Sequence, residues 1–258
     1  MRLPAYACGK QHRDGDFFMS KEKKPLSRGK KIGIGVAAAL VTAAVVGIGV
    51  FYCTFFPNPL AKRIAPVDIS AGEMSVTGES NVLIAYFSIA NNRAYPDGEV
   101  DAVASASLAI REGKGYGHAE LYALAAQEAT GGDLFPIKTA EPYPETYGGA
   151  FDRHRSEMGT SHRPELTEHL DSVEGYDTVI LIYPNWLSGL PQPVLSFLEE
   201  YDFSGKTILP IVTSQALGLG SGPEQIAAAC PGAEVVDGLS ARSEDGVKEF
   251  LKRAGLVI

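Results

Sequence analysis

Residues 183–191 read YPNWLSGLP and contain the single tryptophan of the chain, Trp186. The indole follows a continuous apolar run and precedes a proline-rich segment. An exposed indole at the end of a strand is a platform for a flat aromatic ligand, whose polar rim can bond to neighbouring side chains and backbone N–H groups. Folding of Trp186 over the next helix, as a hydrophobic lid, is an equally good interpretation. The candidate ligand contacts in this loop are Pro184, Asn185, Trp186, Leu187 and Ser188.

A second loop, TSQALGLGSG at 213–222, is polar and contains three glycines. Glycine lets a backbone approach a ligand closely and present N–H groups to it. We expect this loop and the Trp186 loop to face each other across one cleft, although a mobile connector is the plainer alternative. The candidate contacts are Thr213, Ser214, Gln215, Gly218 and Gly220.

A third candidate site begins with SIANNR, residues 88–93, directly after the first apolar run. A phosphate site needs hydroxyl and free N–H groups at a helix N-terminus. The side chains of this stretch meet that need in part, together with the start of the next predicted helix. The candidate phosphate contacts are Ser88, Asn91, Asn92, Gly117 and His118. More than twenty residues separate the two parts, which argues against a tight cradle.

The segments that must position these loops form an α/β pattern. Five apolar runs lie at 82–87, 133–137, 178–184, 207–213 and 233–239. Continuous apolar residues, as opposed to alternating ones, indicate strands that are buried on both faces. Helices are predicted for 118–130, 147–158, 165–173, 191–201, 222–230 and from the capping residue Ser243 onward. The sequence therefore predicts a five-stranded parallel sheet, and such sheets bind ligands beyond the carboxyl ends of their strands.

The N-terminal part of the chain has a different character. Residues 1–31 carry nine Lys and Arg against three acidic residues, whereas residues 57–258 carry fourteen against twenty-eight. Between them, residues 32–56 include no charge and no proline over 25 positions, more than the roughly 20 that cross a bilayer. This pattern predicts a transmembrane helix, with a cleaved signal peptide as the alternative. The positive-inside rule then places the N-terminus in the cytosol and the acidic part outside.

We therefore expect a protein that crosses the cell membrane once. Its expected parts are a basic cytosolic tail (1–31), a transmembrane helix (32–56), a linker (57–79) and a folded extracytoplasmic domain (80–258). The acidic domain gives no basis for nucleic-acid binding, and we expect none. The cysteines Cys8, Cys53 and Cys230 lie in three different parts without metal-binding spacing, so no metal site is predicted, and Cys230 is expected to be a buried thiol. No nucleophile and base set that would define a hydrolase is present, so no catalytic residue is predicted.

Residues 183–213, YPNWLSGLPQPVLSFLEEYDFSGKTILPIVT, resemble one branch of the flavodoxin-like family. The stretches DAVASAS at 101–107, TGGDLF at 130–135 and PGAEV at 231–235 resemble the same branch, so the likeness covers about residues 80–256. The resemblance implies a doubly wound sandwich with strand order 2-1-3-4-5. It also implies non-covalent binding of flavin mononucleotide (FMN) for electron transfer.

By this resemblance, Trp186 stacks on or flanks the isoalloxazine ring, and the loop at 213–220 contacts the ring's pyrimidine side. Pro184 and Asn185 shape the ring's edge. The phosphate is then assigned to Ser88, Gly117 and His118. The predicted function is a membrane-anchored protein that binds FMN and transfers electrons at the extracytoplasmic face, with redox proteins or quinones as partners.

Other functions stay open, because SIANNR, His118, Leu187 and TSQALGLG replace the residues usual in the family. One is a degenerate flavodoxin fold that binds no cofactor and acts as a binding module, and another is an FMN-dependent quinone or nitro reductase. No GxGxxG motif follows a strand, so nicotinamide binding is not predicted. A cluster of basic side chains predicts either an anion or partner site or a solvated helix face; it comprises Arg153, His154, Arg155, His162 and Arg163.

Overall fold

The computed structural model describes residues 63–64, 68–95, 100–101, 107–213 and 218–258. The predicted basic tail and transmembrane helix lie outside these residues, as do Ser214 and Gln215 of the glycine-rich loop. Within the described ranges, no helix combines the length and the apolar character needed to span a bilayer. The transmembrane segment therefore stays a prediction.

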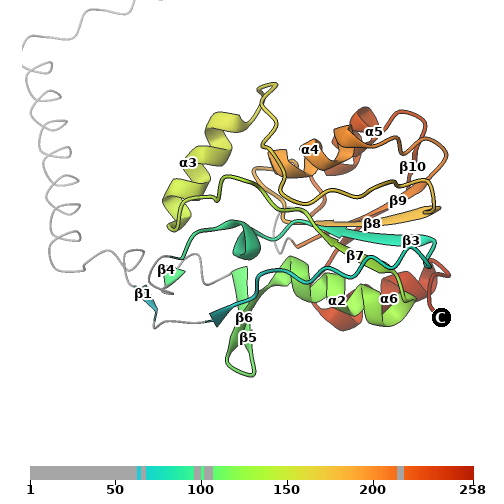
Figure 1. Cartoon of the computed structure of the whole chain (residues 1–258), viewed down its shortest axis with the longest axis horizontal. Helices are drawn as coiled ribbons and strands as arrows, with labels where there is room; N and C mark the ends of the chain where they lie inside the picture. The colour runs from blue at the N-terminus through green and yellow to red at the C-terminus, as the bar shows by residue number, and fades with distance from the viewer. Residues whose placement is uncertain (1–62, 65–67, 96–99, 102–106, 214–217) are drawn as a thin grey trace, which may run out of the picture. The chain divides into compact units, whose positions relative to one another are not determined.

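The central sheet is parallel throughout and has the strand order β10-β9-β8-β3-β7, with β11 also beside β9 (Figure 1). Its strands are β3 (Val82–Tyr86), β7 (Asp133–Pro136), β8 (Thr178–Tyr183), β9 (Thr207–Val212), β10 (Glu234–Val235) and β11 (Leu239–Ser240). Taken in chain order, the first five strands have the predicted arrangement 2-1-3-4-5. The parallel sheet and its order are thus confirmed.

The fifth predicted strand, 233–239, is interrupted, and Pro210 explains the break. Val236 donates its N–H to the carbonyl of Ile208, and Ala241 donates to Val212. Alternate residues of β9 therefore turn their backbone groups towards the last strand. Pro210 is the residue between these two, and it has no N–H to offer. The ladder consequently splits into β10 before this point and β11 after it.

Two helical layers cover the sheet. The helices are α2 (His118–Thr130), α3 (Tyr147–Glu157), α4 (Gln192–Glu200), α5 (Gly222–Ala229) and α6 (Glu244–Arg253). Alternate strand residues point to opposite faces: Ile84, Ile180 and Leu209 pack under α2 and α6, whereas their neighbours pack under α4 and α5. Helices α2 and α6 accordingly lie together on one side, and α3, α4 and α5 lie on the other (Figure 1). Five of the predicted helices are confirmed to within a few residues.

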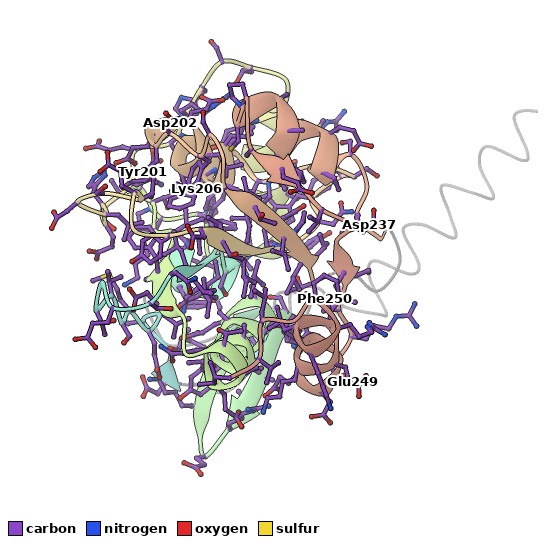
Figure 2. All side chains as sticks on the ribbon, turned by 90° about the vertical axis from the view of Figure 1, so that its right-hand side faces the viewer. Tyr201, Asp202, Lys206, Asp237, Glu249 and Phe250 are labelled. Atoms are coloured by element: carbon purple, nitrogen blue, oxygen red, sulfur yellow. The ribbon has the colours of Figure 1, made fainter. Side chains whose placement is uncertain are left out.

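The predicted helix at 165–173 is wrong, because this stretch is held in an extended form. Leu166 forms an antiparallel bridge with Thr139, and Thr167 donates its N–H to the carbonyl of Lys138. Leu170 donates its N–H to the hydroxyl of Tyr201, which lies at the end of α4 (Figure 2), over 2.7 Å. In a helix the N–H of Leu170 would bond to the carbonyl of Leu166, but here Tyr201 takes it, and the bonds to Lys138 and Thr139 hold the preceding residues against another segment.

The long connection between SIANNR and α2 contains a small second sheet. Strands β5 (Leu108–Arg111) and β6 (Lys114–Gly117) form a hairpin, and β2 (Asp68–Ile69) runs parallel to β6. A further pair joins β1 (Arg63–Ile64) to β4 (Val100–Asp101). The SIANNR stretch itself forms a short 3-10 helix, η2 (Ile89–Asn92).

Part of the predicted linker lies against the domain. Ser75 and Leu134 exchange two backbone hydrogen bonds, and Tyr86 donates its hydroxyl to the carbonyl of Glu73. Asp133 accepts bonds from both the N–H and the hydroxyl of Thr77. We call residues 68–79 the strap. The folded domain therefore begins before residue 80, and the strap is part of it.

Candidate functional site

The carboxyl ends of β3, β8 and β9 carry the loops singled out from the sequence. The connections from β3 lead first to β7 on one side and then to β8 on the other, so the strand order reverses between β3 and β8. Ligands of open α/β sheets bind at such a switch point. The three predicted loops are therefore brought to one edge of the sheet.

The loop after β8 is a tight two-residue turn. Trp186 and Gly189 exchange backbone hydrogen bonds of 3.1 and 2.9 Å, and between them Leu187 and Ser188 have φ values of 49° and 68°. Positive φ values at both central residues are typical of a type I′ turn, whose central positions glycine and asparagine normally occupy. A leucine in this region costs roughly 1–2 kcal/mol. Leu187 is also 44% exposed, so the turn stores strain without burying its apolar side chain.

The loops after β8 and β9 contact each other directly. Asn185 donates its amide to the carbonyl of Gly218 over 2.8 Å, and Leu190 donates its N–H to the side chain of Gln225 over 3.0 Å. Gly220 has a φ of 58°, and a Cβ there would collide with the carbonyl of Ser188. The two loops therefore face each other as predicted, and the described residues, which exclude 214–217, join them by hydrogen bonds.

Trp186 is half-buried among aromatic rings. Its ring centroid lies 5.5 Å from that of Phe87, 5.3 Å from that of Tyr143 and 4.8 Å from that of His154, each in an edge-to-face arrangement. Burial lowers the pKa of His154, while the backbone of Trp186 and the carboxylate of Glu157 act in the opposite direction. The inner side of Trp186 therefore packs on rings after β3, before α3 and in α3, and not on the following helix as the lid interpretation predicted.

Helix α3 holds this aromatic cluster in place through Arg153. The guanidinium lies 4.2 Å from the ring centroid of Tyr143 and bonds the carboxylate of Glu157 over 2.7 Å. Tyr143 donates its hydroxyl to the same carboxylate over 2.9 Å. Within the basic cluster, His154 is buried, and Arg163 pairs with Glu199. Arg153, His154 and Arg163 thus serve packing and pairing, which neither interpretation from the sequence anticipated.

The candidate phosphate contacts are partly committed to other groups. Asn92 donates its amide to the carbonyls of Ser88 and Ile137 and accepts from Thr139. Asn91 donates its amide to the carbonyl of Ser70 over 2.7 Å. Ser88 is buried beside Gly117, where a Cβ would collide with its hydroxyl oxygen. No side chain caps the start of α2, so the first backbone N–H groups of that helix keep their bonding capacity.

Glu120, in the first turn of α2, is a buried charged residue beside the candidate phosphate contacts that the sequence did not reveal. Its side chain is fully buried and accepts from the hydroxyl of Ser70 over 2.5 Å and from the amide of Asn91 over 3.1 Å. Only its position in the first turn of a predicted helix could have drawn attention to it. Its partner Ser70 belongs to the strap, whose packing had no sequence signal.

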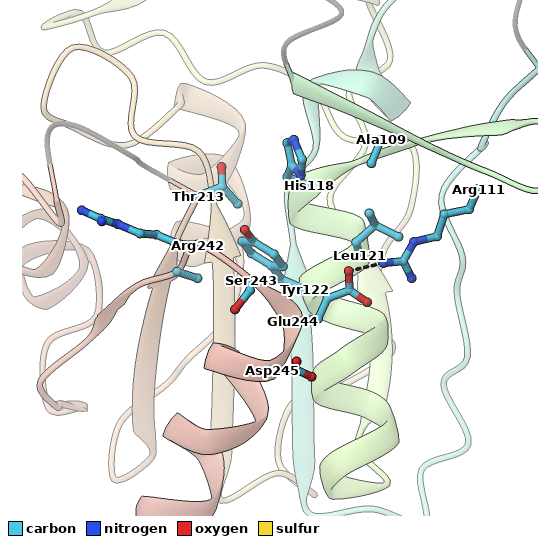
Figure 3. Close-up of a pocket in the computed structure, with 11 residues that line it drawn as sticks. Ala109, Arg111, His118, Leu121, Tyr122, Thr213, Arg242, Ser243, Glu244 and Asp245 are labelled. Carbon is cyan, nitrogen blue, oxygen red and sulfur yellow. Dashed lines mark hydrogen bonds and ion pairs between the residues drawn. The ribbon is translucent and has the colours of Figure 1, made fainter.

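A cavity of about 460 Å³ opens beside this helix start. His118 at the beginning of α2, Thr213 at the end of β9 and Ser243 at the beginning of α6 surround it (Figure 3). Arg111 and Glu244, which form an ion pair, also line it (Figure 3). Two candidate contacts, His118 and Thr213, therefore share one cavity, and Trp186 does not line it.

The described residues show no cluster of ligands for a metal ion. The thiol of Cys230 is buried as expected, and burial, with the nearby charge of Glu199, raises its pKa to about 12. A thiol with this pKa is protonated and unreactive at neutral pH.

Comparison with known proteins agrees with this architecture. The family model described as Flavodoxin matches residues 112–254. The crystal structure of a candidate flavoprotein from Bacteroides uniformis is 25% identical, covers 67% of this chain and 97% of that chain, and gives a TM-score of 0.50. That of a candidate flavoprotein from Bacteroides eggerthii is 24% identical, covers 69% and 99%, and gives 0.51.

A flavoprotein from Lactobacillus acidophilus, solved in complex with FMN, is 17% identical over 66% of this chain and 97% of that chain, with a TM-score of 0.46. No curated protein matches the sequence. The family model spans more than half of the chain, and the chain therefore belongs to the flavodoxin family.

Proposed function

We propose that the domain binds a flavin at the carboxyl edge of its sheet and passes electrons to a redox partner. The observation that carries this proposal is the strained turn after β8. Leu187 and Ser188 hold positive φ values, and Leu187 is exposed. Strain of this kind persists where the surrounding structure enforces it, and it concentrates at ligand sites. The turn offers an apolar side chain and backbone groups at a position where a core gains nothing from them.

The loops at this edge supply the group types that the ring end of a flavin needs. Trp186 and Leu187, after β8, have apolar side chains, and Thr213, after β9, has a hydroxyl. Gly220 keeps the second loop close to the first, since any Cβ there would meet Ser188. When bound, the flavin supplies one- or two-electron chemistry, and the protein sets its binding and its potentials. The acidic charge of the domain favours a basic redox partner.

The test is a titration of the full-length protein with FMN and, separately, with riboflavin. We expect quenching of flavin fluorescence and a shifted visible spectrum with a dissociation constant of about 10 µM or below, a common range for small ligands. FMN is the flavin that the sequence resemblance implies. If neither flavin binds at such concentrations, the proposal is wrong.

A second function, a binding module without cofactor, has its own support. Trp186 already contacts Phe87, Tyr143 and His154, and these contacts satisfy much of its apolar surface without a ligand. The same titration separates the two functions, because a binding module leaves both flavin signals unchanged.

We further propose that residues 32–56 anchor the protein in the cell membrane with the domain outside. Support comes from their 25 uncharged residues and from the basic segment that precedes them. Exposed Ser161 offers a labelling position. In intact cells, an impermeant maleimide should label Ser161→Cys more strongly than the wild type, and the buried Cys230 should stay silent. If intact cells label Ser161→Cys and the wild type equally, and Ser161→Cys gains label only after lysis, the domain lies inside the cell and the proposed topology is wrong.

A further inference from the structure

We infer that Glu120 makes this site select a flavin without a phosphate group, so that riboflavin binds more tightly than FMN. The inference rests on the proposed function and concerns the end of the ligand that faces the start of α2. Glu120 lies in the first turn of that helix, and its side chain is fully buried. Helix N-termini at the carboxyl edge of a sheet are the usual place for a phosphate.

The carboxylate of Glu120 and nearby carbonyls occupy the side-chain donors that could otherwise support a phosphate beside the backbone N–H groups of α2. Asn91 gives its amide group to Glu120 and to the carbonyl of Ser70, and the hydroxyl of Ser70 points to Glu120 as well. Asn92 gives its amide to two backbone carbonyls. Neither asparagine can donate to a phosphate unless it breaks bonds that now satisfy buried groups.

The charge of Glu120 also takes the place of the phosphate charge. The partial positive charge at a helix N-terminus is equivalent to about half an elementary charge, and a buried carboxylate in the first turn compensates it. A phosphate monoester adds about −1.5 to −2 at neutral pH. A buried carboxylate and a phosphate at the same helix start repel each other, because the protein interior screens charges poorly.

Two basic side chains near this point are engaged in ion pairs, whereas Arg242 lines the cavity from the side of α6. Lys138 lies beside Gly72, as Asn91 does, but its ammonium pairs with Glu168 at 4.0 Å. Arg111 pairs with Glu244 on the far side of the cavity. His118 stands at the helix start and lines the same cavity. The ion pairs of Lys138 and Arg111 leave these two cations less able to balance a phosphate, which favours a neutral ligand end such as the ribityl hydroxyl of riboflavin.

The experiment compares riboflavin and FMN on the full-length protein by fluorescence quenching. We expect FMN to bind roughly a hundredfold more weakly, the size expected for a phosphate charge of about −1.5 to −2 that lies about 10 Å from a carboxylate at an effective dielectric constant of about 20. This difference in affinity between riboflavin and FMN, which we call the gap, should shrink as the salt concentration rises, because salt screens the repulsion. Tighter binding of FMN than of riboflavin, or a gap that widens with salt, would overturn the inference. This readout needs no variant.

Variants assign the effect to Glu120. Glu120→Gln keeps the shape and an acceptor oxygen, and it should close most of the gap. Glu128→Gln removes the same charge from the far end of α2, where Glu128 is exposed and pairs with Lys248, and should leave the gap unchanged. Ser70→Ala removes a partner without changing charge and should also preserve the gap. If Ser70→Ala binds the two flavins equally well, the charge of Glu120 does not set the selectivity. The same conclusion follows if folded Glu120→Gln still binds riboflavin much more tightly than FMN.

If neither flavin binds, the proposed function fails and this inference fails with it. That result is distinct from the case in which FMN binds better than riboflavin, because there the proposed function stands and only the role of Glu120 is wrong. A thermal melt of each variant shows whether it is folded.

Discussion

Ser221 donates both its backbone N–H and its hydroxyl to the carbonyl oxygen of Ser188, each over 2.7 Å. These two bonds join the loop after β9 to the strained turn after β8. Gln225 extends the link, because it donates to the hydroxyl of Ser221 and accepts from Leu190. The two loops therefore form one unit, and a change in either should alter the other.

A pair of glycine substitutions tests this unit. Gly218 and Gly220 both have φ values of 58°, but a Cβ at Gly218 meets nothing, whereas one at Gly220 collides with Ser188. Gly218→Ala should cost about 1 kcal/mol of unfolding free energy, from the backbone alone. Gly220→Ala should cost at least about 2 kcal/mol more, from the collision. Equal costs in urea unfolding would show that the two loops are not in contact.

Replacement of Trp186 separates a platform from a lid. Trp186→Ala should weaken flavin binding by roughly 1–3 kcal/mol if the indole flanks the ring, with aromatic base stacking as the guide. It should also lower stability by about 2 kcal/mol, since the side chain is half-buried. Trp186→Phe should recover most of both. A loss of stability with unchanged flavin affinity would identify Trp186 as packing alone.

The buried imidazole of His154 predicts a loss of stability in mild acid. Burial depresses its pKa, so its contribution is complete above the unfolded pKa of about 6.5 and is lost as pH falls below that value. His169, whose pKa is raised by its hydrogen bond and ion pair with Glu200, contributes in the opposite sense, so variants must be compared. From pH 7 to pH 5, the wild type should lose more melting temperature than His154→Phe. His162→Gln, at an exposed position, should follow the wild type.

Asp133 anchors the strap and should be costly to remove. Burial alone would raise its pKa, but hydrogen bonds from Thr77, Gly78 and Tyr176 outweigh burial and lower the pKa. Asp133→Ala leaves these donors unsatisfied and should cost about 3 kcal/mol. Asp177→Ala, where an exposed carboxylate accepts one side-chain bond, should cost about 0.5 kcal/mol. Similar costs would mean that the strap contributes little.

The sequence was sufficient for the sheet, because its signal is local. Continuous apolar runs identified β3, β7, β8 and β9, and Ser243 was identified as the cap of α6, where its side chain accepts from Gly246. The wrong predictions concern segments whose hydrogen-bond partners lie far away in the sequence. The stretch at 165–173 has helical spacing, but its backbone bonds to 138–140 and to Tyr201.

The candidate site divides in the same way. The loops follow from strand ends, so their common edge was predictable. The bond between Asn185 and Gly218 and the burial of Glu120 depend on chain segments that meet only after folding. A single proline in β9 also splits the last strand, and no apolar pattern shows that effect.

Emission of Trp186, the single tryptophan, tests the central claim most directly. The full-length protein is titrated with riboflavin and FMN while tryptophan emission and the visible flavin spectrum are both followed. Binding beside the indole predicts a saturable loss of emission together with a spectral shift, at the same midpoint. Emission that stays unchanged up to a flavin concentration on the order of 10 µM, with no spectral shift, would contradict a flavin site at this edge.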